Sequence, residues 1–560
     1  MQNRCRFGVE LPYNVADVFL NEPERFFSLR LMPPDSAIPQ SPHGPDLMAK
    51  RLKELGADFV VYDLRPHDLA ASINAARWAR ANGLALMLNN PACQINADPT
   101  PGFHTWVYPP DLLEQVKEQV DLLGVIYDEL IHHKVHPGMT GHTNPWNALA
   151  DVTKCVDTGE AYLLVEGGLA DLFAHTAGTH IPAFTEQVIP ALYHAVARSG
   201  GNPGCKVLKE QITPVSLSLC MSAAHQYHTK WLATVDLWEG DSGPWYQIMG
   251  RHSGHSPSEF LNALKLMALL NPFAALSESA DILWVADSVN AEMTEFGETF
   301  RYFRQELLPS IQPAFDVHTW QPTVAFVHCE DGGFRGPKRE LEFDEAPPIY
   351  EEPPVGLLGA PNLPYNVVSA KWLRAWHHLT WGKCSGYSLH NYFNPLESAV
   401  ARQFEVGGDE HDFIHLPTIK ERRDPKRVET HLHNLFTPLN NVAVFDGYVK
   451  PEQLEGVALI VLCGSYCWPE TQAAVRKAVE AGARCLCQEE CAPQDLRASK
   501  GQKLGNGHWW TVSDFDQPAA FEQFLRFRGY PNQWILKSQL GLVRIYSTDP
   551  WGNEINWEVD

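Results

Sequence analysis

The segment Asp121-Leu-Leu-Gly-Val-Ile-Tyr-Asp-Glu129 decides how the rest of the chain is interpreted. It is a short apolar run, about as long as a buried strand, and it ends abruptly in two carboxylates. A strand buried on both faces has no use for Asp128 and Glu129 unless its carboxyl end opens into a site. Catalytic residues of a (β/α)8 barrel sit at that end, so the segment predicts a barrel strand with a functional terminus. The alternative is a strand followed by a solvated acidic turn.

Strands and helices alternate on both sides of this segment, with short turns between them. We expect further strands at 6–11, 26–32, 57–62, 84–88, 205–210, 231–239 and 273–278. We expect helices at 45–55, 69–82, 109–120, 181–198, 257–270 and 299–308. Residues 131–180 break the alternation and are interpreted as a long loop over the site, with a possible strand at 161–165. The pattern predicts the α/β class, with a (β/α)8 TIM barrel over residues 1–320.

The register changes near residue 320. Expected strands at 323–328, 442–445, 457–462 and 483–487 alternate with expected helices at 366–381 and 469–482. This predicts an open, doubly wound α/β domain over residues 321–515, followed by a small β segment at 516–560. No Gly-x-Gly-x-x-Gly or Walker sequence occurs in it, so no nucleotide site is expected.

Size and charge limit the function. A chain of 560 residues is too long for one core. Its formal charge of −23 argues against nucleic acid or an anionic membrane as a partner. No run of 18 apolar residues and no apolar signal-peptide region is present, so we expect a cytoplasmic protein, or an exported one whose signal has been removed. The 17 tryptophans favour carbohydrate as a partner, because sugars stack on aromatic rings.

Cysteine and histidine spacing does not indicate a metal site or another cofactor. Cys463-x3-Cys467 and Cys485-x-Cys487-x3-Cys491 differ from the usual zinc spacings, and we interpret them as reduced thiols at the ends of neighbouring strands. His132, which follows Glu129 by three residues, is interpreted as a loop residue rather than a ligand.

Three glutamates recur at one place, the carboxyl end of an expected strand: Glu129, Glu239 and Glu278. Glu210 is a fourth candidate. The loops at this end of a barrel converge, so these residues can share a pocket although they are far apart in sequence. Hydrolysis of a glycosidic bond needs two carboxyl groups, one to protonate the leaving oxygen and one to attack carbon or activate water. Glu129 is the predicted acid/base. Glu239 is the predicted nucleophile or general base, and Glu278 is the reserve candidate for that role.

Candidate substrate-binding residues surround these glutamates. Asp236, Asp241, Trp238 and Trp245 accompany Glu239 in one stretch, an arrangement that suits a sugar subsite, although an acidic loop with core tryptophans is the alternative. Tyr62, Asp63, Asn89 and Asn90 end earlier strands, and helix capping or turn formation explains them equally well. Asp128, Glu210 and His252 are further candidates, and the alternative for His252 is a loop residue without a role.

The layout resembles the clan A (β/α)8 glycoside hydrolases, particularly the family 42 β-galactosidases. In the barrel the resemblance is carried by Glu129 at the end of strand four and by Glu239 or Glu278. In the second domain it is carried by 454–462, 470–482 and 483–487, which resemble the glutamine-amidotransferase-like segment of that family. One departure is Asp128, where the family has an Asn that holds the sugar 2-hydroxyl. The resemblance implies an acid/base role for Glu129, a nucleophile at Glu239 or Glu278, and a homo-oligomer, most simply a trimer.

The sequence therefore leaves two candidate functions. The first is a glycoside hydrolase that acts on oligo- or polysaccharides, exo-acting by preference. The second is a non-catalytic carbohydrate-binding protein or pseudo-enzyme on the same scaffold. Geometry discriminates between them, because catalysis needs two carboxyl groups roughly 5–10 Å apart across one pocket.

Overall fold

Eight parallel strands form the first sheet of the computed structural model. The structure describes most of the barrel and much of the second domain, and isolated residues elsewhere. The described ranges are 4–11, 44–63, 69–90, 107–130, 158–187, 192–207, 213–236, 257–278, 280–286, 291–313, 315–328, 442–464, 467–513, 544–545 and 557–558.

The strands of this sheet follow one another around a barrel in the order β5-β4-β3-β2-β1-β8-β7-β6. Parallel bridges from Phe184 to Asn202 and from Gln187 to Cys205 join the two end strands and close it. A Cβ atom at Gly204 would lie 2.0 Å from the carbonyl oxygen of Thr185, so only glycine allows the two strands to approach at this seam. The eight strands are β1 (Arg6–Leu11), β2 (Phe59–Asp63), β3 (Ala85–Asn89), β4 (Leu122–Asp128), β5 (Ala183–Glu186), β6 (Gly204–Val207), β7 (Leu232–Val235) and β8 (Ala274–Ser277).

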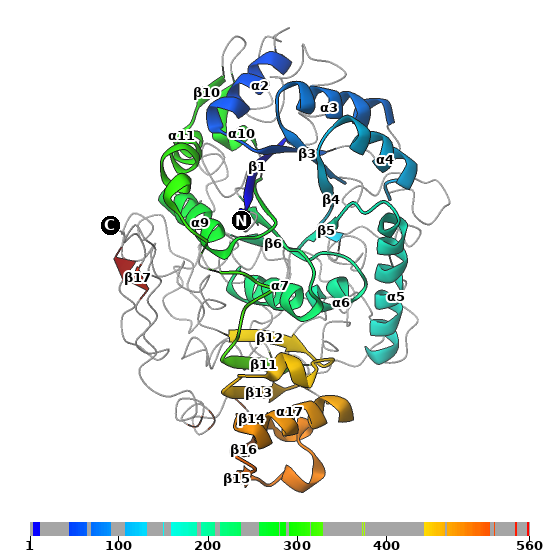
Figure 1. Ribbon diagram of the computed structural model, residues 1–560, viewed down its shortest axis with the longest axis vertical. Helices are drawn as coiled ribbons and strands as arrows, with labels where there is room; N and C mark the ends of the chain where they lie inside the picture. Colours follow the sequence, from blue (N-terminus) through cyan, green and yellow to red (C-terminus); the bar gives the residue numbers. More distant parts are fainter. Residues whose placement is uncertain are drawn as a thin grey trace, which may run out of the picture.

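Helices surround the barrel, as Figure 1 shows in the view along its axis. They pack on the strands through one large apolar cluster to which all eight strands contribute. The described helices are α2 (Gly44–Leu55), α3 (Leu69–Ala81), α4 (Pro110–Gln119), α5 (Thr158–Ala177), α6 (Tyr193–Arg198), α7 (Thr213–Tyr227), α9 (Pro257–Leu270), α10 (Ala280–Leu283) and α11 (Glu295–Tyr302). A small hairpin of β9 (Trp284–Ala286) and β10 (Ala291–Met293) precedes α11, and a π-helical turn at Phe303–Leu307 follows it.

The interior of the barrel has its own apolar layer. Ten buried side chains from alternating strand positions form it, among them Phe59, Ile126, Phe184 and Leu276. Since side chains alternate between the two faces of a strand, the next inward residue toward the carboxyl end lies one layer above this plug. That next layer is polar.

The predicted α/β class and barrel are confirmed, and several local predictions are wrong. Residues 161–165 belong to α5 rather than to a strand, because a short apolar run alone does not distinguish the two. The expected helix at 181–198 is a strand, β5, followed by the short helix α6. The described part of 131–180 is largely the 20-residue α5, not loop, and the expected strand 231–239 already ends at Val235. The expected strand at 26–32 and most of the expected helix at 366–381 lie outside the described residues.

A separate α/β domain follows the barrel. Its sheet has the order β12-β11-β13-β14-β16-β15, parallel except for the last pair. The strands are β11 (Val324–His328), β12 (Val442–Asp446), β13 (Leu459–Cys463), β14 (Arg484–Gln488), β15 (Lys500–Leu504) and β16 (Gly507–Val512), with helix α17 at Pro469–Ala481. Farther on, β17 (Arg544–Ile545) pairs with β18 (Trp557–Glu558). The boundaries expected at 320 and 515 stay predictions.

The two domains meet where α7 packs on the edge strand β12, below the barrel in Figure 1. The buried Asp446 accepts hydrogen bonds from Gln226 (2.7 Å), Tyr227 (2.7 Å) and Arg198. Ser222 accepts a hydrogen bond from the backbone N–H of Val444 at 2.8 Å. These contacts join the second sheet to the helices that follow β5 and β6.

None of the helices in the described ranges has the length and apolar character needed to cross a bilayer.

Candidate active site

The polar layer at the carboxyl end of the barrel is centred on Lys206. This lysine is the third residue of β6, and its side chain is 3% exposed. Strand alternation directs it inward, since Cys205 and Val207 on either side belong to the outer cluster. The layer contains carboxylates from β4, β5, β7 and β8.

Five carboxylates surround the Lys206 ammonium. Glu278 receives hydrogen bonds from Nζ at 3.2 Å to both of its oxygens. The other four have an oxygen within ion-pair distance of the same nitrogen: Glu129 at 3.3 Å, Asp128 at 3.6 Å, Glu186 at 3.7 Å and Asp236 at 3.8 Å. Residues separated by up to 150 positions therefore lie in one cluster.

The five carboxylates differ in how far their side chains are exposed to solvent. The side chains of Glu129 and Glu278 are 19% and 14% exposed, whereas those of Glu186 and Asp236 are each 1% exposed. Only a group that a substrate can reach acts on it directly. Glu129 and Glu278 are thus the better placed of the five for chemistry.

Glu129 has an unusual backbone conformation. Its φ of 45° lies in the left-handed region, which residues other than glycine, Asn and Asp rarely adopt. Its backbone N–H donates to the carbonyl oxygen of Glu186 at 2.9 Å, which fixes the turn against β5. Strained conformations of this kind cluster at functional sites, where the surrounding structure holds them.

The surroundings of Glu186 and Lys206 in the cluster change the pKa values of both groups. Burial raises the pKa of the Glu186 carboxyl to about 8, with Lys206 acting to lower it and Asp128 and Asp236 acting to raise it. Burial also acts to lower the pKa of the Lys206 ammonium, but Asp128, Glu278, Glu129 and Glu186 together raise it well above its usual value. A neutral acid and a permanent cation thus lie side by side at neutral pH. Strongly perturbed pKa values of this kind are typical of functional sites.

A lysine at this position of a barrel could in principle attack a carbonyl carbon. That chemistry needs the neutral amine, and the raised pKa of Lys206 keeps the amine protonated. The described residues contain no group of three or more His, Cys, Asp or Glu arranged to hold a metal ion. The ammonium itself occupies the centre where the carboxylates would bind a cation.

The predicted substrate-binding residues of β2 and β3 lie at the carboxyl end of the barrel, and their surroundings differ from those of the Lys206 ammonium. Asn89 is buried and donates a hydrogen bond at 2.8 Å to Glu10, an inward residue of β1 that the sequence analysis missed. Asn90 is buried too. Tyr62 belongs to the outer cluster and packs edge-to-face on Trp78, so the structure does not bring it to Lys206. Asp63 ends β2, but its side chain is outside the described set.

Several candidates fall outside the described residues altogether. They include the second glutamate favoured from sequence and its aromatic neighbours: Glu239, Trp238, Asp241 and Trp245, together with Glu210, His132 and His252. Asp236, the described residue nearest to them, lies in the cluster.

Sequence reasoning missed Lys206 and Glu186. Lys206 was noted only as part of a strand, and Glu186 lies in a strand that was expected to be helical. Glu186 carried no clear signal, because the strands expected from the sequence already numbered eight without β5. Lys206 occupies a position of β6 whose side chain faces the barrel interior, and this can be recognised only once the strand register is known.

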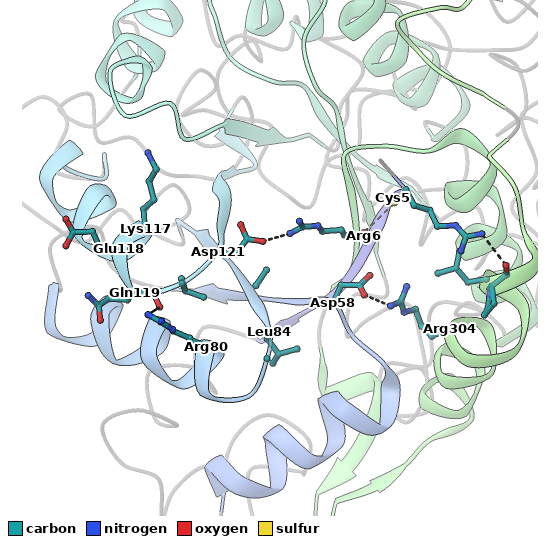
Figure 2. Close-up of a pocket in the computed structure, with 16 residues that line it drawn as sticks. Cys5, Arg6, Asp58, Arg80, Leu84, Lys117, Glu118, Gln119, Asp121 and Arg304 are labelled. Atoms are coloured by element: carbon teal, nitrogen blue, oxygen red, sulfur yellow. Dashed lines mark hydrogen bonds and ion pairs between the residues drawn. The ribbon is translucent and has the colours of Figure 1, made fainter. Parts of the chain in front are cut away.

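A hollow of about 850 Å³ lies at the opposite, amino-terminal end of β1 to β4. Figure 2 shows two ion pairs in this hollow: Arg6 with Asp121 at 2.7 Å, and Arg304 with Asp58 at 2.6 Å. This end of a TIM barrel serves stability rather than catalysis. We therefore place the candidate site at the Lys206 cluster and not at this hollow.

Fold and site together define a TIM-barrel protein with a buried lysine–carboxylate cluster at the carboxyl ends of its strands. No protein-family model matches the chain, and no curated protein matches its sequence.

Solved structures with a similar arrangement are known. An exo-β-1,4-mannosidase from Opitutaceae bacterium strain TAV5 shares 12% identity, covering 89% of this chain and 80% of its own, with a TM-score of 0.40. D-psicose 3-epimerase from Clostridium cellulolyticum H10 shares 11% identity over 54% of this chain and 97% of its own, with a TM-score of 0.30. A putative α-L-fucosidase from Bacteroides thetaiotaomicron shares 11% identity over 54% and 94%, with a TM-score of 0.31. Similarities of this size transfer no activity to the chain.

Proposed function

We propose that the chain is a glycoside hydrolase that cleaves oligo- or polysaccharides with Glu129 and Glu278. The observation that supports this most directly is the convergence of these two accessible carboxylates, from β4 and β8, on the single ammonium of Lys206. Both oxygens lie within 3.3 Å of that nitrogen, so they are separated by no more than twice this distance. Retaining glycosidases hold their two carboxyl groups about 5–5.5 Å apart, which this limit accommodates.

In this proposal Glu129 is the general acid/base and Glu278 is the nucleophile or general base. Glu278 suits the second role because two hydrogen bonds from a cation favour its ionised form. Glu129 suits the first because it is the more exposed of the two. Asp128 and Asp236 belong to the same cluster and Asn89 lies at the same end of the barrel; all three are buried, so they shape the surroundings of Glu129 and Glu278. Glu239 remains the alternative second carboxylate.

A second candidate function is carbohydrate binding without turnover. One observation favours it: the ammonium that bonds both oxygens of Glu278 also competes with any electrophilic carbon for them. A pseudo-enzyme with a neutralised nucleophile would show the same contacts. Binding and turnover must therefore be measured separately.

A panel of nitrophenyl glycosides, followed by plant, algal and bacterial polysaccharides, tests the proposal. We expect turnover of at least one glycoside by the wild-type protein and a loss of more than about 100-fold in Glu278→Gln. The exposed Glu298→Gln serves as the control, because Glu298 pairs only with a surface arginine among the described residues. Saturable binding of a released sugar without hydrolysis of any panel member would select the binding protein instead.

We also propose that the second domain is amidotransferase-like and builds a homotrimer. Support comes from the resemblance to the family 42 enzymes and from the α/β sheet of the domain, whose strand edges suit a structural role. The alternative is a monomer in which the domain braces its own barrel through α7 and β12.

A further inference from the structure

Lys206 places a full positive charge at the centre of five acids, and the two-carboxylate mechanism alone does not require it. Its Nζ lies between 3.2 and 3.8 Å from an oxygen of each acid. An ammonium has three protons to donate, fewer than the carboxylates around it. The hydrogen bonds from Nζ go to Glu278, while the other four carboxylates lie at ion-pair distance.

Without this charge the carboxylates would repel one another strongly. They lie in the interior, where water screens their charges poorly, so each disfavours the ionisation of the others. The lysine keeps its proton, because the carboxylates raise its pKa well above the usual value although burial acts to lower it. Its positive charge is therefore constant over the working pH range of a protein.

The junction of β5 and β6, which closes the barrel, fixes the position of the Lys206 ammonium. Lys206 belongs to β6, and its backbone N–H donates to the carbonyl oxygen of Gln187 at 3.1 Å. Gly204 in the same strand lets β5 and β6 approach closely. The ammonium thus reaches the cluster from the strand between β5 and β7, with Glu129 after β4 and Glu278 after β8 two strands away on either side.

We propose that Lys206 is a positioning residue whose ammonium holds the Glu278 carboxylate ionised and oriented and offsets the repulsion among the other four carboxylates. The catalytic consequence of this role rests on the proposed function; the electrostatic role does not.

A role for the positive charge of Lys206 and a role for its shape predict different effects of substitution. If Lys206 only filled space, Lys206→Met, with a similar unbranched side chain, would replace it and Lys206→Arg would not. If the charge matters, the order reverses. Lys265→Met is the matched control, because Lys265 is also a buried lysine but lies on the outer helix α9.

The first experiment needs no substrate. Urea-unfolding midpoints are measured at pH 5 and pH 8 for the wild type, Lys206→Met, Lys206→Arg and Lys265→Met. Without the ammonium the carboxylate pKa values rise in the folded state, so stability is present at low pH and lost as the pH rises through them. We expect the midpoint of Lys206→Met to fall between pH 5 and pH 8 relative to wild type. Lys206→Arg should keep the wild-type pH dependence. Burial lowers the pKa of Lys265, so Lys265→Met measures the pH dependence that follows from removing a buried lysine elsewhere, and the fall in Lys206→Met should exceed it.

The second experiment uses whichever nitrophenyl glycoside the wild type hydrolyses. Glu278 must be ionised to act, so the acid limb of the kcat profile should move up by about one pH unit or more in Lys206→Met. Lys206→Arg should return the limb toward its wild-type position. If the wild type hydrolyses no glycoside, the proposed function fails, but the unfolding data still test the role of Lys206.

Lys206→Met is at risk of not folding, and the double variant Lys206→Met/Asp236→Asn addresses this. It removes one charge of each sign, so we expect it to be more stable at pH 8 than Lys206→Met. The proposal is overturned if Lys206→Met keeps the wild-type pH dependence, if Lys206→Arg behaves like Lys206→Met, or if neither Lys206→Arg nor the double variant folds.

Discussion

The ammonium of Lys206 lies 3.2 Å from both carboxylate oxygens of Glu278, a contact between β6 and the residue that follows β8. It joins two residues that the sequence separates by 72 positions. The same nitrogen pairs with Glu129 on the far side of the site. One cation thus links the two carboxylates proposed for chemistry.

Glu186→Gln tests the environment of the cluster. The pKa of Glu186 is raised to about 8 in the folded protein, mainly by burial. An acid with a raised folded pKa contributes stability below its unfolded pKa, near 4.5, and that contribution is lost as the pH rises toward 8. The amide does not ionise, so the variant should gain stability relative to wild type over this window, by up to about 1.4 kcal/mol per pH unit.

Chemical denaturation at pH 5, 6.5 and 8 measures this difference. Glu480→Gln, on the exposed face of α17, is the control and should show no such trend. A constant difference between Glu186→Gln and wild type at the three pH values would show that Glu186 is ionised throughout, contrary to the account.

The contact between the domains depends on Asp446. This buried carboxylate accepts from Arg198, Tyr227 and Gln226, and Asp446→Asn removes the more deeply buried of the two carboxylates that pair with Arg198, the other being Glu166. We expect a loss of about 3 kcal/mol at neutral pH. His194 and Arg198 lower the pKa of Asp446 against the opposing effect of burial, so the loss should shrink as the pH falls below about 4.

Urea unfolding followed by circular dichroism checks this prediction. Asp121→Asn removes a comparable but exposed arginine partner and should cost less than about 1 kcal/mol. Equal losses from both substitutions would mean that Asp446 does not hold the domains together.

The proposed trimer predicts a mass three times that of one 62.8 kDa chain. The net charge of −23 opposes association through self-repulsion, so added salt should favour the trimer. Light scattering coupled to size-exclusion chromatography, at micromolar concentration and two salt concentrations, measures this. The mass of a single chain under both conditions would rule the trimer out.

The sequence alone predicts those site residues that a local pattern identifies. Glu129 and Glu278 were found because each directly follows an apolar run of strand length, and the structure places both at the carboxyl end of the barrel. β5 was missed because its four residues are too few for periodicity to show, while the apolar 161–165 was taken for a strand although it lies in a long helix.

Lys206 could not be found in this way. A lysine one position after Cys205 carries no local signal, and its inward direction follows from the register that closes β5 on β6. Five carboxylates around one ammonium is a property of the closed barrel, not of any segment. The charge balance of the site therefore had to come from the structure.

The most direct test of the account compares Glu129→Gln with wild type on aryl glycosides of one sugar whose leaving groups differ in acidity. The substitution is isosteric and should keep the fold, which thermal unfolding confirms independently. Because a poor leaving group needs a proton from Glu129, we predict a loss in kcat of roughly 100- to 10,000-fold for the least acidic phenol and a much smaller loss for the most acidic one. An equal loss across the series would contradict the acid/base role of Glu129 and with it the proposed division of labour between Glu129 and Glu278.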